Sequence, residues 1–372
     1  LQPLLMPVMP KHVYGDGQDV KKHPRNTQDV VGSGPFKVTE YKKGQHLILE
    51  RYDGFFRKGR PYLDRIVFKV IKAAGTRFLS FDPGEADYFA FTAFTPREVK
   101  RLQEKEGVTV TDQGYGAIGH VNYLELNLRR KPYDDIRVRE AIAYAIDQDF
   151  IVNTLQLGTT RREDGPFHGS SPFADPSVYT TYDVDLDKAN AMLDEAGHPR
   201  GDGGTRFSLQ LDYASFHPDS QELVAGYLKA QLKKVGIDIQ IRKSPDFGTW
   251  AKRVSNWEYD LTMNAIWNYP DPVIGVHRAF LCTNQKKGVI WSNTEGYCNE
   301  KVDELLNKAA VETDFEKRKA LYSEFQKIVT DELPFYWTNE EAYVTVQSKK
   351  VKTPPLSVWG ALAPLDSVYL AE

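Results

Sequence analysis

The chain has 372 residues, of which 41% are hydrophobic and 27% are charged. This length and composition are typical of a globular protein with two lobes or domains, and they exclude a disordered chain. Because 48 Lys and Arg are balanced by 51 Asp and Glu, for a net charge of −3, and no basic block occurs, we expect no nucleic-acid partner. No apolar run reaches the roughly 18 residues of a membrane span.

The chain starts at Leu1, and the first residues lack the basic segment and apolar core of a secretory signal. We therefore interpret the chain as a fragment or a processed form.

The first third of the chain favours β-structure. The runs "GPFKVTEY", "HLILERY" and "DRIVFKVI", at 34–41, 46–52 and 64–71, carry β-branched and aromatic residues with partial alternation and are separated by turn residues. A helix is predicted over 96–107, because a proline opens this segment and a glycine closes it.

Two capped helices are predicted next. In "PYDDIRVREAIAYAID", apolar residues recur at helical spacing, and Asp134 or Asp135 provides the N-cap. The segment "DLDKANAMLDEAG", at 185–197, begins with a second candidate cap and ends at a glycine. Capping explains these acidic residues without catalysis.

The segment 206–242 predicts a strand, a crossover helix and a parallel strand. "RFSLQLDY" and "IDIQIR" alternate, and the intervening segment has a helical apolar face. We assign that face to Leu223, Val224, Tyr227, Leu228, Leu232 and Val235. Later, helices are expected near 299–312 and 314–331, and "AYVTVQ" is expected to be a strand that returns to the first lobe.

The segment "AIWNYPDPVIG", at 265–275, is predicted to be a loop because of its two prolines, and it follows the alternating strand "YDLTMNAIW". Ligands of open α/β sheets bind beyond the carboxyl ends of strands, where Asn268 would lie. Trp267 and Tyr269 can form flat walls, Asn268 offers an amide, and Asp271 offers charge. The alternative is a stiff turn whose aromatic residues cap the core.

The chain has two cysteines, Cys282 and Cys298, and their spacing does not fit a CxxC metal motif. Two unrelated buried thiols are one interpretation. We prefer a disulfide, which would stabilise the protein by roughly 3 kcal/mol and would indicate an oxidising compartment.

Several segments resemble the solute-binding proteins of ABC importers, in the group that includes oligopeptide- and dipeptide-binding proteins. The resemblance rests on "VGSGPFKVTEYKKGQHLILERYDGFFRKGRPYLDRIVFKVI", on "LELNLRRKPYDDIRVREAIAYAID", and on "WNYPDP" followed by "WSNTEGYCNEKVDELL". It implies an α/β, two-lobe periplasmic binding protein of type II, with mixed sheets and a hinge, that is periplasmic or extracellular with or without a lipid anchor.

The resemblance also implies the division into lobes and the partners. Residues 1–117 with 340–372 would form lobe I, incomplete because its N-terminal strands and a small extra domain are absent, and 118–339 would form the second lobe. A peptide or peptide-like solute would bridge the lobes and favour the closed form, which a membrane permease and an ATPase would recognise. No enzyme activity, cofactor or metal is implied.

The ligand site implied by the resemblance departs from the pattern of the group at one position. Where this chain has Asn268, peptide-binding relatives commonly have an Asp that pairs with the peptide α-ammonium; Asp271 or another acid would then have to supply the charge, or the ligand would not be a simple peptide amine. Tyr123, with Asn122 beside it, corresponds to a tyrosine at the cleft, and Trp337 is a candidate wall. Core or hinge packing is the alternative for these three.

Three other functions remain as rivals. An enzyme is disfavoured because no phosphate-binding loop, nucleophile elbow or HExxH motif occurs. A non-peptide solute, such as an oligosaccharide, an opine-like conjugate or a metal chelate, stays open because aromatic and amide groups also suit sugars. A purely structural module would need no cleft.

Overall fold

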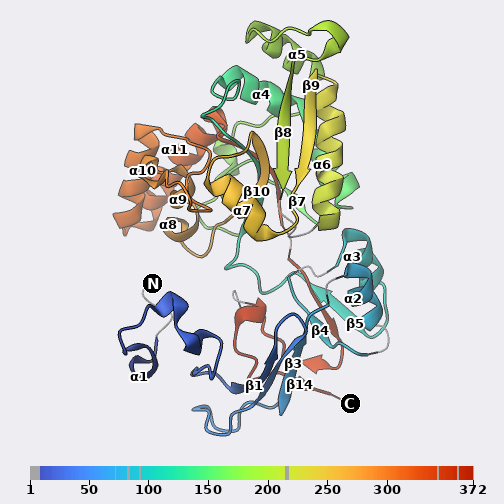
Figure 1. Ribbon diagram of the computed structural model, residues 1–372, viewed down its shortest axis with the longest axis vertical. Helices are drawn as coiled ribbons and strands as arrows, with labels where there is room; N and C mark the ends of the chain where they lie inside the picture. The colour runs from blue at the N-terminus through green and yellow to red at the C-terminus, as the bar shows by residue number, and fades with distance from the viewer. Residues whose placement is uncertain are drawn as a thin grey trace. The chain divides into compact units, whose positions relative to one another are not determined.

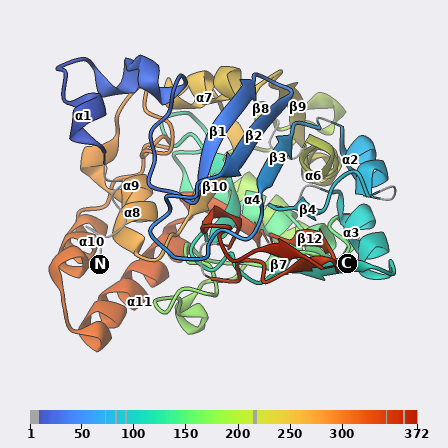
Figure 2. The same ribbon diagram turned by 90° about the horizontal axis from the view of Figure 1, so that it is seen from below.

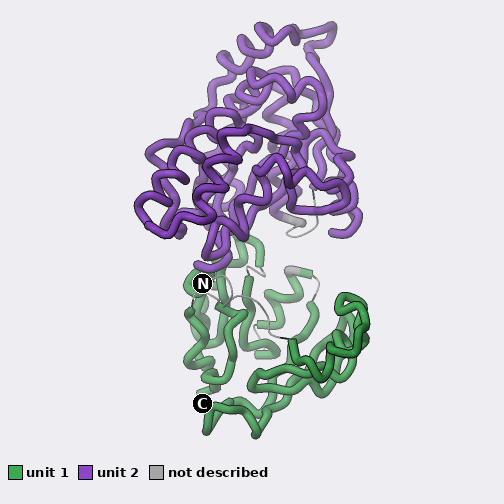
Figure 3. The backbone as a smooth tube through the Cα atoms, turned by 90° about the vertical axis from the view of Figure 1, so that its left-hand side faces the viewer, with its two compact units in different colours: residues 1–115, 343–372 green, residues 116–342 purple. Residues whose placement is uncertain are grey.

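The computed structural model describes residues 9–71, 73–81, 84–91, 94–213, 218–341, 343–357 and 360–371. The chain divides into two compact units (Figure 3): unit 1 contains residues 1–115 and 343–372, and unit 2 contains residues 116–342. The chain therefore passes between the units twice, after residue 115 and after residue 342.

Unit 1 contains small antiparallel sheets. The first, visible in Figure 2, has the order β1 (Phe36–Lys42), β2 (His46–Arg51), β3 (Arg65–Lys69), which confirms the three predicted strands. The second places β12 (Thr345–Ser348) between β4 (Tyr88–Phe89) and β5 (Val108–Thr111), so the predicted returning strand does pair with the first part of the chain. The third joins β13 (Val351–Lys352) to β14 (Tyr369–Leu370).

The α-helices in the described part of unit 1 are α1 (Lys11–Tyr14), α2 (Ala74–Phe81) and α3 (Pro96–Gln103). The last is the helix predicted over 96–107, but it ends four residues earlier. Its N-terminus is fixed by a capping box: the Thr95 hydroxyl accepts from the Glu98 amide, and the Glu98 carboxylate accepts from the Thr95 amide.

Unit 2 is built on a six-stranded mixed sheet. Its order is β7 (Arg161–Arg162), β11 (Phe335–Glu340), β6 (His120–Leu126), β10 (Leu261–Trp267), β8 (Phe207–Tyr213) and β9 (Ile237–Lys243). β8 and β9 are parallel and are connected through α6 (Pro218–Lys233), which lies along them in Figure 1. The strand–helix–strand prediction is confirmed.

The remaining helices of unit 2 cover this sheet and extend from it. Among the described residues they include α4 (Ile136–Ala145), a π-helical segment (Phe150–Leu155), α5 (Leu186–Glu195), α7 (Phe247–Ser255), α8 (Pro272–Gly275), α9 (His277–Phe280), α10 (Glu300–Val311) and α11 (Phe315–Glu332). The predicted caps are present, since Asp135 accepts from Arg137 N and Asp185 accepts from Lys188 N.

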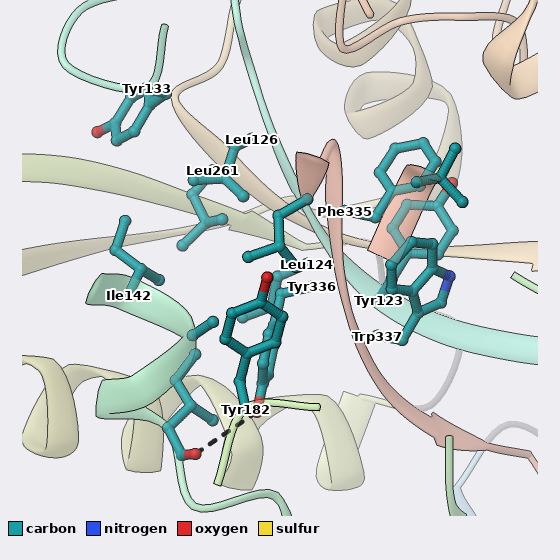
Figure 4. Close-up of a cluster of buried hydrophobic side chains, with 14 of the residues drawn as sticks. Tyr123, Leu124, Leu126, Tyr133, Ile142, Tyr182, Leu261, Phe335, Tyr336 and Trp337 are labelled. Atoms are coloured by element: carbon teal, nitrogen blue, oxygen red, sulfur yellow. Dashed lines mark hydrogen bonds between the residues drawn. The ribbon is translucent and has the colours of Figure 1, made fainter. Parts of the chain in front are cut away.

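The core of unit 2 joins the sheet to its helices. Figure 4 shows part of it, where Tyr123 on β6 lies beside Phe335 and Trp337 on β11. The Tyr123 and Phe335 ring centroids are 4.2 Å apart. In β10 residues of both faces are buried, because this strand lies between β6 and β8 in the sheet; the alternation read from the sequence did not predict this.

Two details of the sequence interpretation were wrong. Leu223 is 54% exposed, whereas we placed it on the core face of α6; Val224, Leu228 and Leu232 are buried there. The predicted loop 265–275 is also shorter, because β10 continues through Trp267 and α8 starts at Pro272. The irregular backbone is confined to residues 268–271, which we call the site loop.

Candidate functional site

The site loop lies at one edge of the unit 2 sheet. β10, β8 and β9 are parallel to one another, and both β10 and β11 are antiparallel to β6. The carboxyl ends of these four strands therefore share an edge with the start of β6, where Trp267 faces His120 in the strand register. This is the edge at which open α/β sheets bind ligands.

Both connections to unit 1 also leave unit 2 at this edge. β6 begins at His120 and β11 ends at Glu340, and the Glu341 amide donates to the His120 carbonyl at 2.9 Å. The site loop thus lies beside the two chain segments that join the units.

A close approach of two backbones shapes the site loop. A Cβ atom on Gly275 would lie 2.0 Å from the Trp267 carbonyl oxygen and 2.6 Å from that of Asn268. Only glycine allows α8 to pack against the end of β10 in this way. The end of α8 therefore packs directly against the backbone at the end of β10.

Trp267 belongs to an aromatic cluster contributed by several segments. Its ring centroid lies 5.0 Å from that of His120 and 5.0 Å from that of Trp291, which it meets edge to face at 84°. Phe247 stacks on Trp291 at 5.5 Å. Trp267 and Trp291 are both partly exposed, so this cluster presents an aromatic wall at the sheet edge.

Two residues near this wall have a left-handed backbone. Tyr269 has φ +54° and is 37% exposed, and Trp291 has φ +55°. This conformation is unfavourable for bulky side chains, and strained residues of this kind cluster at functional sites. Sequence reasoning identified Tyr269 but missed Trp291, Phe247 and His120.

Asn268 is 2% exposed, and both ends of its amide are bound within unit 2. Its Oδ1 accepts from the His168 amide at 2.6 Å, and its Nδ2 donates to the Pro166 carbonyl at 3.1 Å. Its own backbone N–H donates to the Gly119 carbonyl at 2.8 Å. The side chain therefore ties the segment 166–168 to the site loop, and a carboxylate could not make the bond to Pro166.

Asp271 is also bound by its surroundings. It caps α8 by accepting from the Val273 amide at 3.0 Å, and it forms a two-bond ion pair with Arg318 at 2.9 and 3.1 Å. Burial acts to raise the pKa of Asp271, but the hydrogen bonds from Arg318 and Val273 lower it below its ordinary value. Its charge is neutralised by Arg318.

The other expected site residues have different environments. Asn122 is partly exposed, and its Nδ2 donates to the Glu341 carboxylate at 3.2 Å. Tyr123 and Trp337 are 4% and 3% exposed within the core cluster, and burial raises the pKa of Tyr123. The structure thus brings Trp267, Asn268, Tyr269 and Asp271 together, whereas Tyr123 and Trp337 pack behind the sheet edge.

Cys282 and Cys298 form a disulfide, as predicted, with their Cα atoms 4.7 Å apart. The loop between them carries Trp291 and is anchored to unit 2 at several points. Thr294 donates to the Glu125 carboxylate at 2.6 Å, and the Leu128 amide donates to the Glu295 carbonyl at 2.9 Å.

The described residues provide neither a cluster of metal ligands nor a membrane-spanning helix. In these ranges, no group of three or more His, Cys, Asp or Glu side chains is arranged to hold a metal ion. No helix there has the length and apolar character needed to cross a bilayer.

Sequence comparison relates the chain to binding proteins. It is 24% identical over 306 residues to the dipeptide-binding protein of Escherichia coli, covering 82% of this chain and 55% of that protein. It is 28% identical over 345 residues to the oligopeptide-binding protein AppA of Bacillus subtilis, covering 87% of this chain and 60% of AppA. The chain thus spans somewhat more than half the length of these relatives.

Solved structures show the same fold. AppA of B. subtilis in complex with a nonapeptide superposes with a TM-score of 0.83 at 24% identity, covering 98% of this chain and 72% of that one. DppA of Helicobacter pylori in complex with the peptide STSA gives 0.80 at 25% identity, covering 95% and 65%. AgaA of A. tumefaciens, solved with agropinic acid, gives 0.79 at 20% identity, covering 95% and 70%.

These neighbours are two-lobe periplasmic binding proteins, so the predicted α/β fold class is confirmed. The model of the family described as "Bacterial extracellular solute-binding proteins, family 5 Middle" matches residues 2–287 of the chain. The chain belongs to family 5 of the bacterial extracellular solute-binding proteins.

Proposed function

We propose that this chain is the solute-binding component of an ABC importer and that it captures peptides or peptide-like solutes outside the cytoplasm. The solute binds between two lobes, which correspond to units 1 and 2, and stabilises their closed arrangement because only that arrangement makes both sets of contacts. A membrane permease with its ATPase receives the closed form. No bond of the solute is made or broken.

The observation that carries this proposal is the aromatic wall at the sheet edge where both connections leave unit 2. Family membership supports a solute-binding role, and the names of the E. coli and B. subtilis relatives support a peptide ligand. The disulfide supports an oxidising, extracytoplasmic location.

The geometry of unit 2 supports a division of roles among the site residues. Trp267 and Tyr269 contact the solute with their partly exposed rings, and Asn122 hydrogen-bonds to it. Asn268 and Asp271 hold the site loop in place through bonds within unit 2. Tyr123 and Trp337 support the wall from the core.

A non-peptide solute is the second candidate, and one observation favours it. The position that commonly carries an acid in peptide-binding relatives is Asn268 here, and its amide is committed to Pro166 and His168. An oligosaccharide, an opine-like conjugate or a metal chelate would use the aromatic wall without needing a countercharge at this position.

Native mass spectrometry of the chain, purified without refolding and then incubated with a pool of short peptides, tests the proposal. We expect a retained or added mass of a peptide, released by mild unfolding. The same chain with Trp267→Ala is the comparison and should carry less of it. A glycan or conjugate mass would favour the second candidate, and the absence of any small molecule under all conditions would contradict solute binding.

A further inference from the structure

The segment 164–169, which follows β7, is held at both of its ends by buried glutamates. Glu163 Oε1 accepts from the backbone amides of Asp164 and Gly165 at 3.0 and 2.9 Å. At the other end, the Glu340 Oε1 atom accepts from the Gly169 amide. Glu340 is the last residue of β11, two positions before unit 2 ends.

The same segment is joined to the site loop. The His168 amide donates to Asn268, and the Pro166 carbonyl accepts from it. A continuous path of contacts therefore runs from the end of β11, through Glu340 and residues 166–169, to Asn268. The segment packs closely against Glu340, since a Cβ atom on Gly169 would lie 2.9 Å from Glu340 Oε1.

The two glutamates also face each other. The Glu163 and Glu340 carboxyls interact with each other, both hold backbone amides of the same segment, and the residues are only 7% and 5% exposed. A buried pair of this kind favours keeping one proton, because two ionised carboxylates repel each other strongly when they are buried. Burial raises the pKa of Glu163 well above its ordinary value, and the Glu340 carboxylate raises it further.

Several charged groups surround the pair, and Arg161 lies opposite Glu340 in the register of β7 and β11. His168 Nε2 lies 3.7 Å from Glu340 Oε2, but burial lowers the pKa of His168 even though Glu340 acts to raise it. Arg162 is engaged by three other carboxylates, and burial keeps Tyr179 neutral. The charged and titratable groups facing the pair are thus His168, Arg161, Arg162, Asp164 and Tyr179.

We propose that Glu163 and Glu340 share one proton and act as a latch that holds residues 166–169 against the site loop, which makes both glutamates positioning residues for the solute site. The proposal rests on the proposed function for its link to solute binding. When the shared proton is lost as the pH rises, the carboxylates separate, the segment releases Asn268, and the site loop loosens. Solute affinity then falls as the pH rises.

Hydrogen exchange of the Gly169 and His168 amides, measured between pH 6 and 9 and corrected for intrinsic rates, tests the latch without any ligand. If opening is coupled to the loss of one proton, the equilibrium constant for opening increases up to tenfold for each unit of pH. We expect the protection of these amides in the unmodified chain to fall with this slope. In Glu163→Gln the slope should vanish, because the amide donates to Glu340 without titrating.

Three further variants make the experiment decisive. Glu340→Gln should also remove the slope while keeping an acceptor for Gly169, whereas Glu340→Ala should lose Gly169 protection at every pH. Glu195→Gln changes an exposed acid on α5 and should behave like the unmodified chain. Equal pH slopes in the unmodified chain and in both glutamine variants would overturn the proposal, as would protection that does not change with pH.

Calorimetric titration with the peptide Ser-Thr-Ser-Ala at the same pH values gives the functional readout. Affinity should decline with rising pH in the unmodified chain and stay level in Glu163→Gln. If this peptide and the peptide pool bind at no pH, the proposed function fails, while the exchange slopes still decide whether the latch exists.

Discussion

The most informative perturbation of the site loop is Asn268→Asp, which introduces the acid that the resemblance to peptide-binding proteins implies at this position. In this chain Asn268 is buried, and its Nδ2 donates to the Pro166 carbonyl. An ionised carboxylate has no hydrogen to donate, so the carbonyl loses its partner and faces a buried negative charge. Glu340, which holds Gly169 on the same segment, adds to this unfavourable charge.

The expected cost depends on pH. A buried carbonyl without a donor costs about 1–3 kcal/mol. Desolvation of the new carboxylate raises its pKa above the value in the unfolded chain, and each unit of that increase costs about 1.4 kcal/mol of stability. We therefore expect a loss of about 2–5 kcal/mol in unfolding free energy at pH 8. Because the native state holds the proton more tightly than the unfolded state, the loss disappears as the pH falls below the unfolded-state pKa of about 3.9, where the protonated acid can donate as the amide does.

Urea unfolding followed by tryptophan fluorescence, at about pH 3.5, below the unfolded-state pKa of Asp, and at pH 8, measures this difference. Asn307→Asp is the control, because Asn307 is exposed on α10, and it should cost less than about 0.5 kcal/mol at either pH. If Asn268→Asp is as stable as the unmodified chain at pH 8, the amide does not hold the segment 166–168, and our interpretation of Asn268 is refuted.

Three further predictions concern stability, each measured by denaturant unfolding. Gly275→Ala should cost about 1–3 kcal/mol, because its Cβ would overlap the Trp267 carbonyl, whereas Gly226→Ala in α6, with nothing within 4 Å of its Cβ, should be neutral or stabilising by up to about 1 kcal/mol; equal effects would show that the contact at Gly275 is relieved without cost. Cys282→Ser should cost roughly 3 kcal/mol under oxidising conditions and nothing with reductant present; the same loss in reductant would point to packing instead of the bond. Glu125→Gln should cost about 1–3 kcal/mol, because both carboxylate oxygens now accept hydrogen bonds, one from Tyr259 and Thr294 and the other from Asn264, and a glutamine side chain can accept at only one end; unchanged stability would mean that the two hydroxyls turn to accept from the new amide.

Local signals in the sequence predicted much of the fold. The caps at Asp135 and Asp185 and the strand–helix–strand unit through α6 each depend on residues that are close in sequence. Leu223 was misplaced because helical spacing gives the apolar face of α6 but not how far the neighbouring elements cover it. The burial of both faces of β10 depends on its place in the sheet order, which local patterns do not encode.

The site was predicted less completely, for a related reason. The loop with Trp267 and Tyr269 could be recognised from its prolines and aromatic residues, but the partners of Asn268 lie about 100 residues away in the chain, at Pro166 and His168. Trp291 and Phe247 join Trp267 only through tertiary packing. The one available signal for Trp291 was its position between the two cysteines.

The central claim is that a solute is captured against the aromatic wall of unit 2. Calorimetric titration of the solute identified by mass spectrometry, into the unmodified chain and into Trp267→Ala, tests it most directly. We predict at least a tenfold weaker affinity in the variant, together with a native fold by circular dichroism. Equal affinities in the two proteins would place the bound solute elsewhere and contradict the account.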